Sequence, residues 1–365
     1  MKIGILTFHR ALNYGALLQA YALKKKLTDL GADAQIVDYR NDLIESMYYI
    51  KSFKECKGIK EKLHYFLTHR RDETKAKNFD SFRKEYLGLS NLNYYNSNTI
   101  NKVSSFFDRF ITGSDQVWNP KAHNFDKHFY LDFVSTEKKF SYAASFGEDI
   151  DPVYYNELDL LLQDYSICSV REKEGENIIH KINSTIVTRV DVDPVYLLSK
   201  EEWRKFFNVK KNSKKYALVY LFRLTEKTKE MIRNLYDNGY EIYYLGKPLR
   251  SPFNFKVKFI GSAGPKEFIE LFYNSSYVVT NSFHGTSFSI IFNKPFALEL
   301  FINTSRLENI VRLTGLESRI YDNNTNCDEF LNRNIDWNKV NSTMRSSIDN
   351  SVVFLKETIT NEQYH

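Results

Sequence analysis

The sequence predicts an α/β protein with two domains, and three observations lead to this prediction. The chain has 365 residues, which exceeds the usual size of a domain built around a single hydrophobic core. Short apolar, β-branched runs alternate with amphipathic stretches at helical spacing, a rhythm typical of parallel sheets covered by helices. The rhythm stops at a polar segment, Lys200 to Lys215, and then starts again. Two Rossmann-like domains facing across a cleft are therefore expected.

The first half begins as a strand, a helix and a second strand. Residues 2–7 form an apolar run, and residues 13–27 repeat apolar side chains every three or four positions, as an amphipathic helix does. Gly31 is expected to end this helix, and residues 34–39 to form the next strand. Such a strand–helix–strand start predicts parallel pairing. The further strands expected in this half are residues 110–113, 139–145, 166–170 and 188–192.

The second half repeats the pattern after the polar segment. A strand is expected at residues 216–222, followed by a helix at 228–238 and a strand at 240–245. Pro265 marks the start of a helix that ends near Asn274. The last expected elements are a strand at 277–280, a helix after His284, a strand at 295–300 and a helix at 342–358.

These elements give the expected domain boundaries. The first domain takes residues 1–195 and carries a basic helical insert at about 45–100. The second domain takes residues 215–340, after a linker at 196–214. A C-terminal helix within residues 341–365 is expected to pack back on the first domain.

Composition limits where the protein works. Three cysteines, Cys56, Cys168 and Cys327, are widely spaced without a CxxC pair, which argues against a disulfide framework or a structural zinc site. The chain contains no run of about 18 apolar residues, so no membrane span is expected. The apolar run at the start of the chain is too short for the hydrophobic region of a signal sequence. A cytoplasmic protein is expected.

Positive charge is concentrated in one segment. Residues 51–85 hold eleven Lys or Arg and six Asp or Glu, a net of +5 within a chain whose net charge is +6. One interpretation is a pair of solvated surface helices. Another is a patch that contacts anionic membrane lipid, at the inner face of the membrane, or a lipid pyrophosphate acceptor. No nucleic-acid-binding motif accompanies the charge, so nucleic acid is not an expected partner.

His284 lies where a strand is expected to end and a helix to begin. Ligands of open α/β sheets bind outside the carboxyl ends of the strands. Backbone N–H groups at Gly285 and Thr286 are expected to face the same place and attract an anion. A titratable imidazole beside an anion site suits phosphate chemistry. The alternative is a histidine that caps its own helix.

Several familiar fingerprints are absent. The chain has no GxGxxG, GxxxxGK[ST] or HExxH motif, so dinucleotide, P-loop and zincin sites lack their signatures. Asp191-Val-Asp193 fits a D-x-D pattern that holds a metal–nucleotide pair in some glycosyltransferases, but three residues match by chance often. A strand end leading to the linker explains the segment as well, and no metal is expected.

Six short segments, in order, resemble the polysaccharide pyruvyltransferase family from residue 3 to about 320. They are Asn13-Tyr-Gly-Ala-x-Leu-Gln-Ala-Tyr-Ala-Leu, Gly113-Ser-Asp-Gln-Val-Trp-Asn119, Ser141-Tyr-Ala-Ala-Ser-Phe-Gly147, Ser169-Val-Arg-Glu172, Asp193-Pro and Ser282-Phe-His-Gly285. The resemblance implies a fold like that of GT-B glycosyltransferases, with the acceptor on the first domain and the donor on the second. It also implies transfer of pyruvate from phosphoenolpyruvate (PEP) to two sugar hydroxyls as a ketal, in the assembly of capsule or exopolysaccharide in bacteria.

The chemistry of such a transfer selects residue types. PEP carries a carboxylate and a phosphate, which guanidinium groups and helix N-termini bind. Protonation of its methylene needs a general acid, and His284 is the candidate because a bound phosphate dianion would favour its charged form. Arg171, at the family's Ser-Val-Arg segment, and Arg306 are candidate donor ligands. The alternatives are a surface salt bridge from Arg171 to Glu172 or Glu174, and an ordinary surface position for Arg306.

Acceptor contacts are expected from the first domain. Asp115 is a candidate to accept a hydroxyl proton or to anchor the sugar, unless it caps its turn through the N–H of Val117. Trp118 is a candidate platform for a sugar ring, with core packing as the alternative. Asn13 and Tyr14 suit acceptor contact or packing between domains. Ser145 and Gly147 are candidates of the same kind.

One position departs from the family. Many relatives carry an arginine two residues before the motif histidine, and this chain has Ser282 there. Either Arg306, Arg171 or Arg223 supplies the missing charge, or the donor differs. A GT-B glycosyltransferase using a nucleotide sugar is the main alternative, with Glu299 as its candidate ribose ligand. A non-catalytic scaffold is a third possibility. No cofactor is expected beyond PEP as co-substrate.

Overall fold

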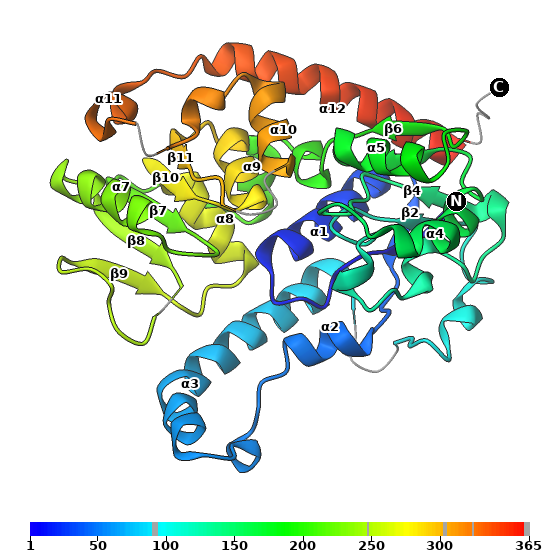
Figure 1. The fold of residues 1–365 in the computed structure, drawn as a ribbon, viewed down its shortest axis with the longest axis horizontal. Coiled ribbons are helices and arrows are strands. Elements are labelled where there is room, and N and C mark those ends of the chain that lie inside the picture. Colours follow the sequence, from blue (N-terminus) through cyan, green and yellow to red (C-terminus); the bar gives the residue numbers. More distant parts are fainter. Residues whose placement is uncertain (90–93, 247, 302–304, 323–324, 361–365) are drawn as a thin grey trace. The chain divides into compact units, whose positions relative to one another are not determined.

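The computed structural model describes residues 1–89, 94–246, 248–301, 305–322 and 325–360. The chain forms two compact units. The first comprises Met1–Tyr49, Arg83–Leu198 and Arg345–His365, and the second comprises Ile50–Phe82 and Ser199–Met344. Figure 1 labels many of their helices and strands.

Parallel strands form the first unit's sheets, as its strand–helix–strand start predicted. The main sheet has the order β2-β1-β3-β4, and every pairing in it is parallel. A parallel pair, β5 and β6, continues from it through a bridge between Ala144 and Val170. The strands are β1 Lys2–Leu6, β2 Asp33–Ile36, β3 Arg109–Thr112, β4 Lys139–Ser141, β5 Cys168–Val170 and β6 Thr188–Val190.

Helix α1, Tyr14–Asp29, follows β1 as expected. Its N-cap is Asn13, whose side chain accepts from the N–H groups of Gly15 and Ala16. The chain leaves the helix through Gly31, whose φ of 98° is readily adopted by glycine alone. The unit's other α-helices are α2 Asp42–Met47, α4 Tyr155–Leu162, α5 Lys173–Ile182 and part of α12 Trp337–Thr360. Its 3-10 helices are η3 Ile100–Val103, η4 Pro120–Ala122, η5 Lys127–Tyr130, η6 Thr136–Lys138, η7 Pro152–Tyr154 and η8 Pro194–Leu197, and η2 Arg83–Leu87 is a π-helix.

Aromatic side chains fill much of the first unit's core. Trp118 is fully buried and stacks on Tyr130, with ring centroids 6.0 Å apart. The Tyr130 hydroxyl donates to the Trp118 carbonyl at 2.8 Å, and the Tyr165 hydroxyl donates to the Tyr130 carbonyl at 2.8 Å. These bonds satisfy the hydroxyls of the two tyrosines, so both rings are buried without leaving a hydroxyl unpaired.

His123 is held neutral inside this core. Its Nδ1 accepts from the backbone N–H of Asp126 at 2.8 Å, and its Nε2 lies 3.0 Å from the Val117 carbonyl, to which it donates. An imidazolium has no acceptor nitrogen, so protonation would break the first bond. Burial lowers the pKa of His123 to about 4, against the opposing charge of Asp126.

Acid should therefore destabilise the protein through His123. Because the folded pKa lies below the unfolded one, the unfolded state binds more protons between about pH 6.5 and 4. This contribution to stability is complete above pH 6.5 and is lost as pH falls, up to about 3 kcal/mol at about 1.4 kcal/mol per pH unit. The free energy of unfolding, measured with urea at several pH values in this range, should depend less steeply on pH for His123→Asn than for the wild type. Equal slopes would contradict the assignment.

The second unit contains a five-stranded parallel sheet in the order β11-β10-β7-β8-β9. Its strands are β7 Tyr216–Tyr220, β8 Glu241–Leu245, β9 Val257–Ile260, β10 Tyr277–Thr280 and β11 Phe296–Leu298. Its helices are α3 Ile59–Phe82, α6 Lys200–Phe206, α7 Glu226–Asp237, α8 Pro265–Asn274, α9 Phe283–Ile291, α10 Ser305–Thr314 and α11 Cys327–Asn332, with the 3-10 helices η1 Phe53–Glu55 and η9 Glu317–Arg319.

Arg319 holds the β11 side of this sheet together. Its side chain is fully buried and donates to the carbonyl of Phe296 at 2.8 Å and to the hydroxyl of Tyr277 at 2.6 Å. It also donates to carbonyls of Phe330 and Arg333. One guanidinium thus ties β10 and β11 to α11 and the turn after it. Burial lowers the pKa of this guanidinium below its ordinary value, although Tyr277 acts in the opposite direction.

The basic segment lies with the second unit, although the sequence analysis assigned it to the first domain. The Asn78 side chain donates to the Ser262 carbonyl at 2.8 Å, just before α8. Phe82 is buried, and its ring lies 6.0 Å from that of Phe207. These contacts join residues far apart in sequence, which chain order alone does not indicate.

The C-terminal helix packs on the first unit, as predicted. Ser351 accepts from the N–H of Val192 at 3.2 Å, and the guanidinium of Arg189 lies 4.1 Å from the centre of the Phe354 ring. Residues 361–365 of the expected segment lie outside the described residues. Among the described helices, none combines the length and apolar character that crossing a membrane requires.

Candidate functional site

His284 lies at the start of α9, four residues after the end of β10, as the sequence predicted. The four residues of β10 are all buried and β-branched or aromatic, which suits an inner strand of a parallel sheet. Ser282 is the N-cap of α9. His284 is the second helical residue and is 8% exposed. The positive end of the helix dipole therefore lies at the imidazole.

The amides of Gly285 and Thr286 serve the helix rather than an open anion site. The Gly285 N–H donates to the Ser282 hydroxyl at 3.4 Å, and the Thr286 N–H donates to the Ser282 carbonyl at 2.9 Å. This corrects the expectation that both amides are free for an anion. The physical reason is the serine N-cap, which satisfies the first turn of the helix.

Gly285 permits close packing between α9 and the sheet. A methyl group at this position would collide with the Thr280 hydroxyl and would lie 3.1 Å from Tyr220 Cδ1. The Thr280 hydroxyl is fixed because it donates to the Tyr220 carbonyl at 2.8 Å. The glycine therefore sets how closely the His284 turn approaches β7 and β10.

Gly285→Ala should displace this turn. We expect a loss of about 1–3 kcal/mol in the free energy of unfolding, the usual cost of overpacking. Urea unfolding measures this free energy. Ala297→Gly, which removes a methyl group from the same sheet, is the matched variant. An alanine variant as stable as the wild type would show that the turn adapts and that its position is not set by Gly285.

Other polar groups lie at the same edge of this sheet. Asn281 joins the loops after β7 and β10: its side chain accepts from the N–H of Phe222 at 2.8 Å and donates to the carbonyl of Arg223 at 2.8 Å. Arg223 is exposed, and its guanidinium lies 4.5 Å from the centre of the Phe301 ring. Sequence reasoning missed Asn281, although an amide directly after a buried strand was the available signal.

Arg306 is the second residue of α10, and its side chain is half-buried. Helices α9 and α10 pack against each other. Arg306 and Arg223 are thus cationic residues on elements that adjoin the His284 helix or its strand.

A second polar cluster lies at the carboxyl ends of β3 to β6 in the first unit. Arg171 donates to Asp193 at 2.9 Å and to Glu172 at 3.2 Å. Ser114 donates to the same Asp193 oxygen at 3.0 Å. Ser145 donates to Glu172 and accepts from the N–H of Gly147 at 3.0 Å. The side chains of Arg171, Glu172 and Asp193 are all buried.

Arg171 therefore forms a salt bridge with Glu172, as its alternative interpretation proposed, but the pair is buried rather than at the surface and Asp193 is a further partner. Burial lowers the pKa of its guanidinium, but the charges of Glu172, Asp193 and Asp115 outweigh this and raise the pKa above its ordinary value. The neighbouring carboxylates outnumber the cation, so the cluster as a whole offers an anion little attraction. Sequence reasoning named Asp193 and Glu172 but did not foresee that they meet on Arg171.

Asp115 is the more accessible carboxylate of this cluster. It is half-buried and has a φ of 80°, which is uncommon for a residue other than glycine. Its Oδ1 accepts from the N–H of Gln116 at 2.9 Å, rather than from Val117 as its structural alternative proposed. Burial raises the pKa of Tyr48, and the charge of Asp115 raises it further. Such strained conformations occur often at functional sites.

The remaining acceptor candidates have structural roles. Trp118 is fully buried in the core, which corrects its assignment as a sugar platform. Ser145 is fully buried and bonded to Glu172, so it does not face an acceptor in this structure. Asn13 caps α1, and Tyr14 is 5% exposed at the first turn of that helix.

Sequence reasoning also missed a buried pair after β1. His9 Nε2 lies 2.9 Å from Asp38 Oδ1, and His9 Nδ1 lies 2.9 Å from the Thr7 carbonyl. Arg83 donates to the His9 carbonyl at 2.8 Å. Both side chains of the pair are almost fully buried, so the pair fixes the loop that leads to Asn13.

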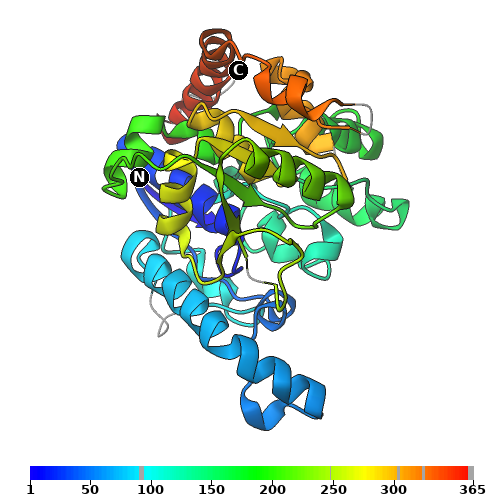
Figure 2. The same ribbon diagram turned by 90° about the vertical axis from the view of Figure 1, so that its left-hand side faces the viewer.

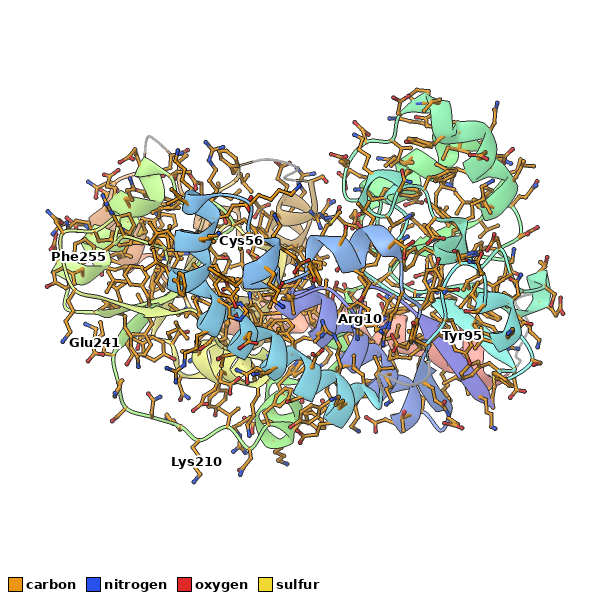
Figure 3. The ribbon with its side chains drawn as sticks, turned by 90° about the horizontal axis from the view of Figure 1, so that it is seen from below. Arg10, Cys56, Tyr95, Lys210, Glu241 and Phe255 are labelled. Carbon is orange, nitrogen blue, oxygen red and sulfur yellow. The ribbon has the colours of Figure 1, made fainter. Side chains whose placement is uncertain are left out.

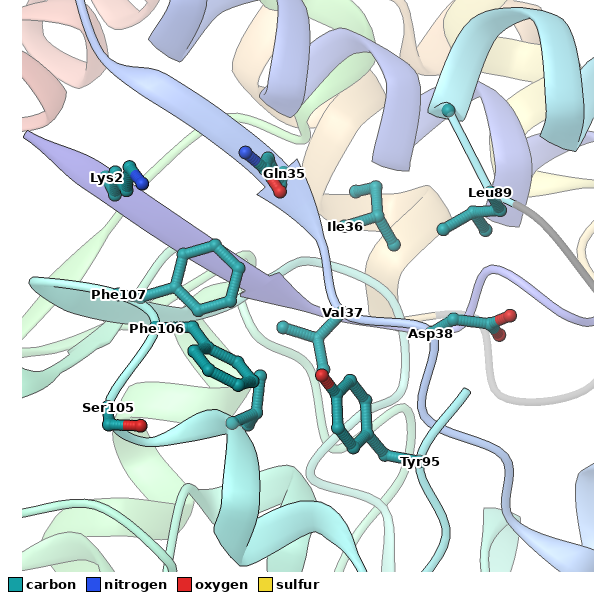
Figure 4. A pocket seen from close by; sticks show the side chains of 12 residues that line it. Lys2, Gln35, Ile36, Val37, Asp38, Leu89, Tyr95, Ser105, Phe106 and Phe107 are labelled. Carbon is teal, nitrogen blue, oxygen red and sulfur yellow. The ribbon is translucent and has the colours of Figure 1, made fainter. Parts of the chain in front are cut away.

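A cavity of about 560 Å³ lies beside the edge strand β2 (Figure 4). Val37, Tyr95, Phe106 and Phe107 line it together with polar side chains, among them those of Lys2, Gln35 and Asp38. None of the residues expected to act in catalysis or binding lines it. One of its lining residues, Leu89, directly precedes residues 90–93, which lie outside the described part.

Metal ligands were also sought among the side chains. Within the described ranges, no group of three or more His, Cys, Asp or Glu residues is placed to hold a metal ion. Asp191, of the D-x-D segment, instead accepts from Arg189 at 2.7 Å and from Ser169 at 2.6 Å.

Comparison with protein families decides the assignment. A family model described as polysaccharide pyruvyl transferase matches residues 13–298, most of the chain. The chain belongs to the polysaccharide pyruvyl transferase family. The match includes the Arg171 cluster and the His284 turn, and it ends before Arg306. A search of curated proteins finds no match.

Solved structures show the fold of this family member. A UDP-N-acetylglucosamine 2-epimerase described as putative, from Listeria monocytogenes, aligns with a TM-score of 0.54 and 11% identity, over 99% of this chain and 97% of that chain. The UDP-GlcNAc 2-epimerase of Neisseria meningitidis, bound to UDP-GlcNAc, aligns with a TM-score of 0.51 and 11% identity, over 99% of this chain and 100% of that chain. Both are of the GT-B type, and at this identity the likeness shows the fold alone. The predicted GT-B-like fold class is confirmed.

Proposed function

We propose that the protein transfers pyruvate from PEP, as a ketal, to two hydroxyls of a sugar in a cell-surface glycan or its lipid-linked precursor. The family assignment supports pyruvyl transfer. The observation that carries the donor assignment is the position of His284 at the positive end of α9, beside the carboxyl end of β10. We place this reaction in the cytoplasm, where PEP is available.

His284 is the proposed general acid. It protonates the PEP methylene, which makes the adjacent carbon electrophilic. One sugar hydroxyl adds to this carbon and gives its proton to a base, phosphate leaves, and a second hydroxyl closes the ring and also loses its proton. Of the two hydroxyl protons, one replaces the proton that His284 gave to the methylene and the other leaves with the phosphate. The products are the ketal and one phosphate, and no water is consumed. The dianionic phosphate of the donor favours imidazolium at this position, against the helix dipole.

Arg223 and Arg306 are the proposed partners of the donor's charges. Ser282 stands where many relatives carry an arginine, so the positive charge must come from another element. Arg171 is already held by two buried carboxylates, whereas Arg223 is exposed at the same sheet edge as Ser282. We therefore assign Arg171 to holding the first unit's cluster in place. Asp115, the more accessible carboxylate there, is the proposed base for the acceptor hydroxyl.

The proposal needs no resident cofactor, because cationic side chains neutralise the donor and the proton transfers use ordinary side chains. Its test is phosphate release from PEP in the presence of galactose-type, glucose-type and N-acetylmannosamine-type acceptors. Release that requires both PEP and an acceptor supports the proposal. Absence of release with the whole panel, from a protein that PEP does not stabilise against heat, would reject it.

A nucleotide-sugar glycosyltransferase is the second candidate, and one observation favours it. Glu299, 6% exposed, lies directly after β11 and accepts from the Thr225 hydroxyl at the start of α7 at 2.7 Å. A carboxylate there suits a ribose hydroxyl. Thermal-shift measurements with PEP, UDP, GDP and CMP separate the candidates, because stabilisation by a nucleotide and not by PEP would favour the second.

A further inference from the structure

The N-terminal half of α3 and the turn before it carry a row of exposed large apolar side chains. Ile59 is 87% exposed and Phe66 is 71% exposed. Leu63 and Leu67 are also exposed, and so is Phe53 of η1, whose ring lies 5.3 Å from that of Phe66. We call these five residues the α3 apolar surface. Large apolar patches on soluble proteins usually mark a contact with a partner or a membrane.

These side chains form one stripe because of helical spacing. Positions 59, 63, 66 and 67 follow the i, i+4, i+7, i+8 rule, so they share one face of α3. Thr68, on the opposite face, is buried. Farther along, the C-terminal half of α3 packs in the second unit through Asn78 and Phe82. The stripe is therefore the outward face of a helix that is anchored at its other end.

The turn that leads into α3 is built to hold Phe53 in place. Its capping box joins Ser52 and Glu55, whose carboxylate accepts from the Ser52 N–H at 2.7 Å. Figure 2 shows this turn beside the N-terminal end of α3. Cys56, labelled in Figure 3, is buried in the same turn. Phe53 packs on both Tyr65 and Phe66. The turn thus extends the stripe instead of shielding it from solvent.

Positive charge surrounds the stripe. Residues 51–71 contain seven Lys or Arg and two Glu, a net of +5. Lys60 and Lys62 lie on either side of the stripe by helical position, and Arg70 continues it. Lys62 Nζ lies 5.5 Å from the centre of the Phe53 ring, and Lys54 and Lys57 follow Phe53 closely in the sequence. Apolar side chains rimmed by cations match the chemistry of a bilayer surface with anionic headgroups.

We propose that the α3 apolar surface docks on an anionic lipid bilayer. Its five apolar side chains enter the headgroup–acyl boundary, and the flanking lysines bind lipid phosphates. A second copy of this chain is a poorer occupant, because two surfaces of net +5 repel each other. Nucleic acid is a poorer occupant as well, since it would leave the aliphatic side chains in water. The proposal is independent of which donor the enzyme uses.

Vesicle co-sedimentation of the full chain tests the proposal. The wild type should bind vesicles of phosphatidylcholine with phosphatidylglycerol, should bind phosphatidylcholine alone far less, and should be released by salt. Leu63→Ser/Phe66→Ser should lower binding at least about 10-fold, because two of the apolar side chains that enter the bilayer are lost. Lys54→Glu/Lys62→Glu should also lower it and should weaken the dependence on salt.

Matched variants elsewhere control for general effects. Val153→Ser/Leu160→Ser removes two exposed apolar side chains from α4 and the turn before it, and Lys211→Glu/Lys214→Glu reverses two exposed lysines. Both should bind vesicles like the wild type, and all variants should keep the wild-type melting temperature. The proposal would be overturned if the wild type did not bind vesicles, or if both α3 variants bound them as well as the wild type does. It would also be overturned if sedimentation showed a dimer that Leu63→Ser/Phe66→Ser abolishes without a change in vesicle binding.

Discussion

Replacing His284 with alanine is expected to lower kcat for pyruvyl transfer by about 10²–10⁴-fold, the usual contribution of a positioned general acid. The reason is that His284 stands at the helix start beside β10, and no other histidine lies in the α9 segment. The loss should appear in kcat more than in the KM for PEP, because proton transfer matters most in the transition state. Steady-state phosphate release measures both.

Two controls make this result specific. His180→Ala removes an exposed histidine that contacts Thr188 in the first unit, and its activity should be unchanged. A cooperative thermal transition should show that His284→Ala is folded, so that a lower kcat does not reflect a loss of structure. A His284→Ala enzyme with kcat within a few-fold of the wild type would remove His284 from the chemistry.

Replacing Arg171 with methionine is expected to lower the free energy of unfolding by about 3–5 kcal/mol, the usual cost of breaking a buried ion pair. The substitution leaves Glu172 and Asp193 buried without their shared cation. Transfer activity should fall with it, because the loops after β3, β5 and β6 meet at this cluster and one of them carries Asp115. Urea unfolding at neutral pH measures the stability.

A second substitution separates charge from packing. Adding Asp193→Asn to Arg171→Met removes one of the uncompensated carboxylates, so part of the lost stability should return. Arg204→Met breaks an exposed pair with Glu201 and should change stability little. If Arg171→Met were as stable as the wild type, the cluster would not be the structural anchor proposed here.

The sequence predicted local structure best where the signals were local. The observed bounds of α8 and β10 equal the predicted ones, because Pro265 marks a helix start and a run of buried β-branched residues marks an inner strand. Strand β9 was not predicted. It lies at the sheet edge, and its Lys258 interrupts the apolar run that marked the other strands.

Long-range contacts were beyond local patterns. The salt bridge between Arg171 and Asp193 joins two strands of the first unit, and the placement of α3 in the second unit depends on Asn78 meeting Ser262. Trp118 in a polar motif suggested a ligand platform, but its burial is decided by Tyr130 and Tyr165 from other segments. The His284 turn was predictable because a strand end, an N-cap serine and a helix follow one another directly in the chain.

Transfer of a labelled pyruvyl group is the most direct test of the central claim. The enzyme is incubated with PEP labelled with ¹³C at its three carbons and a sugar acceptor, and the glycan is analysed by mass spectrometry. The account predicts an acid-labile three-carbon label on the acceptor, with one phosphate released for each label. An unlabelled acceptor that gains a sugar from a nucleotide-sugar donor would contradict it.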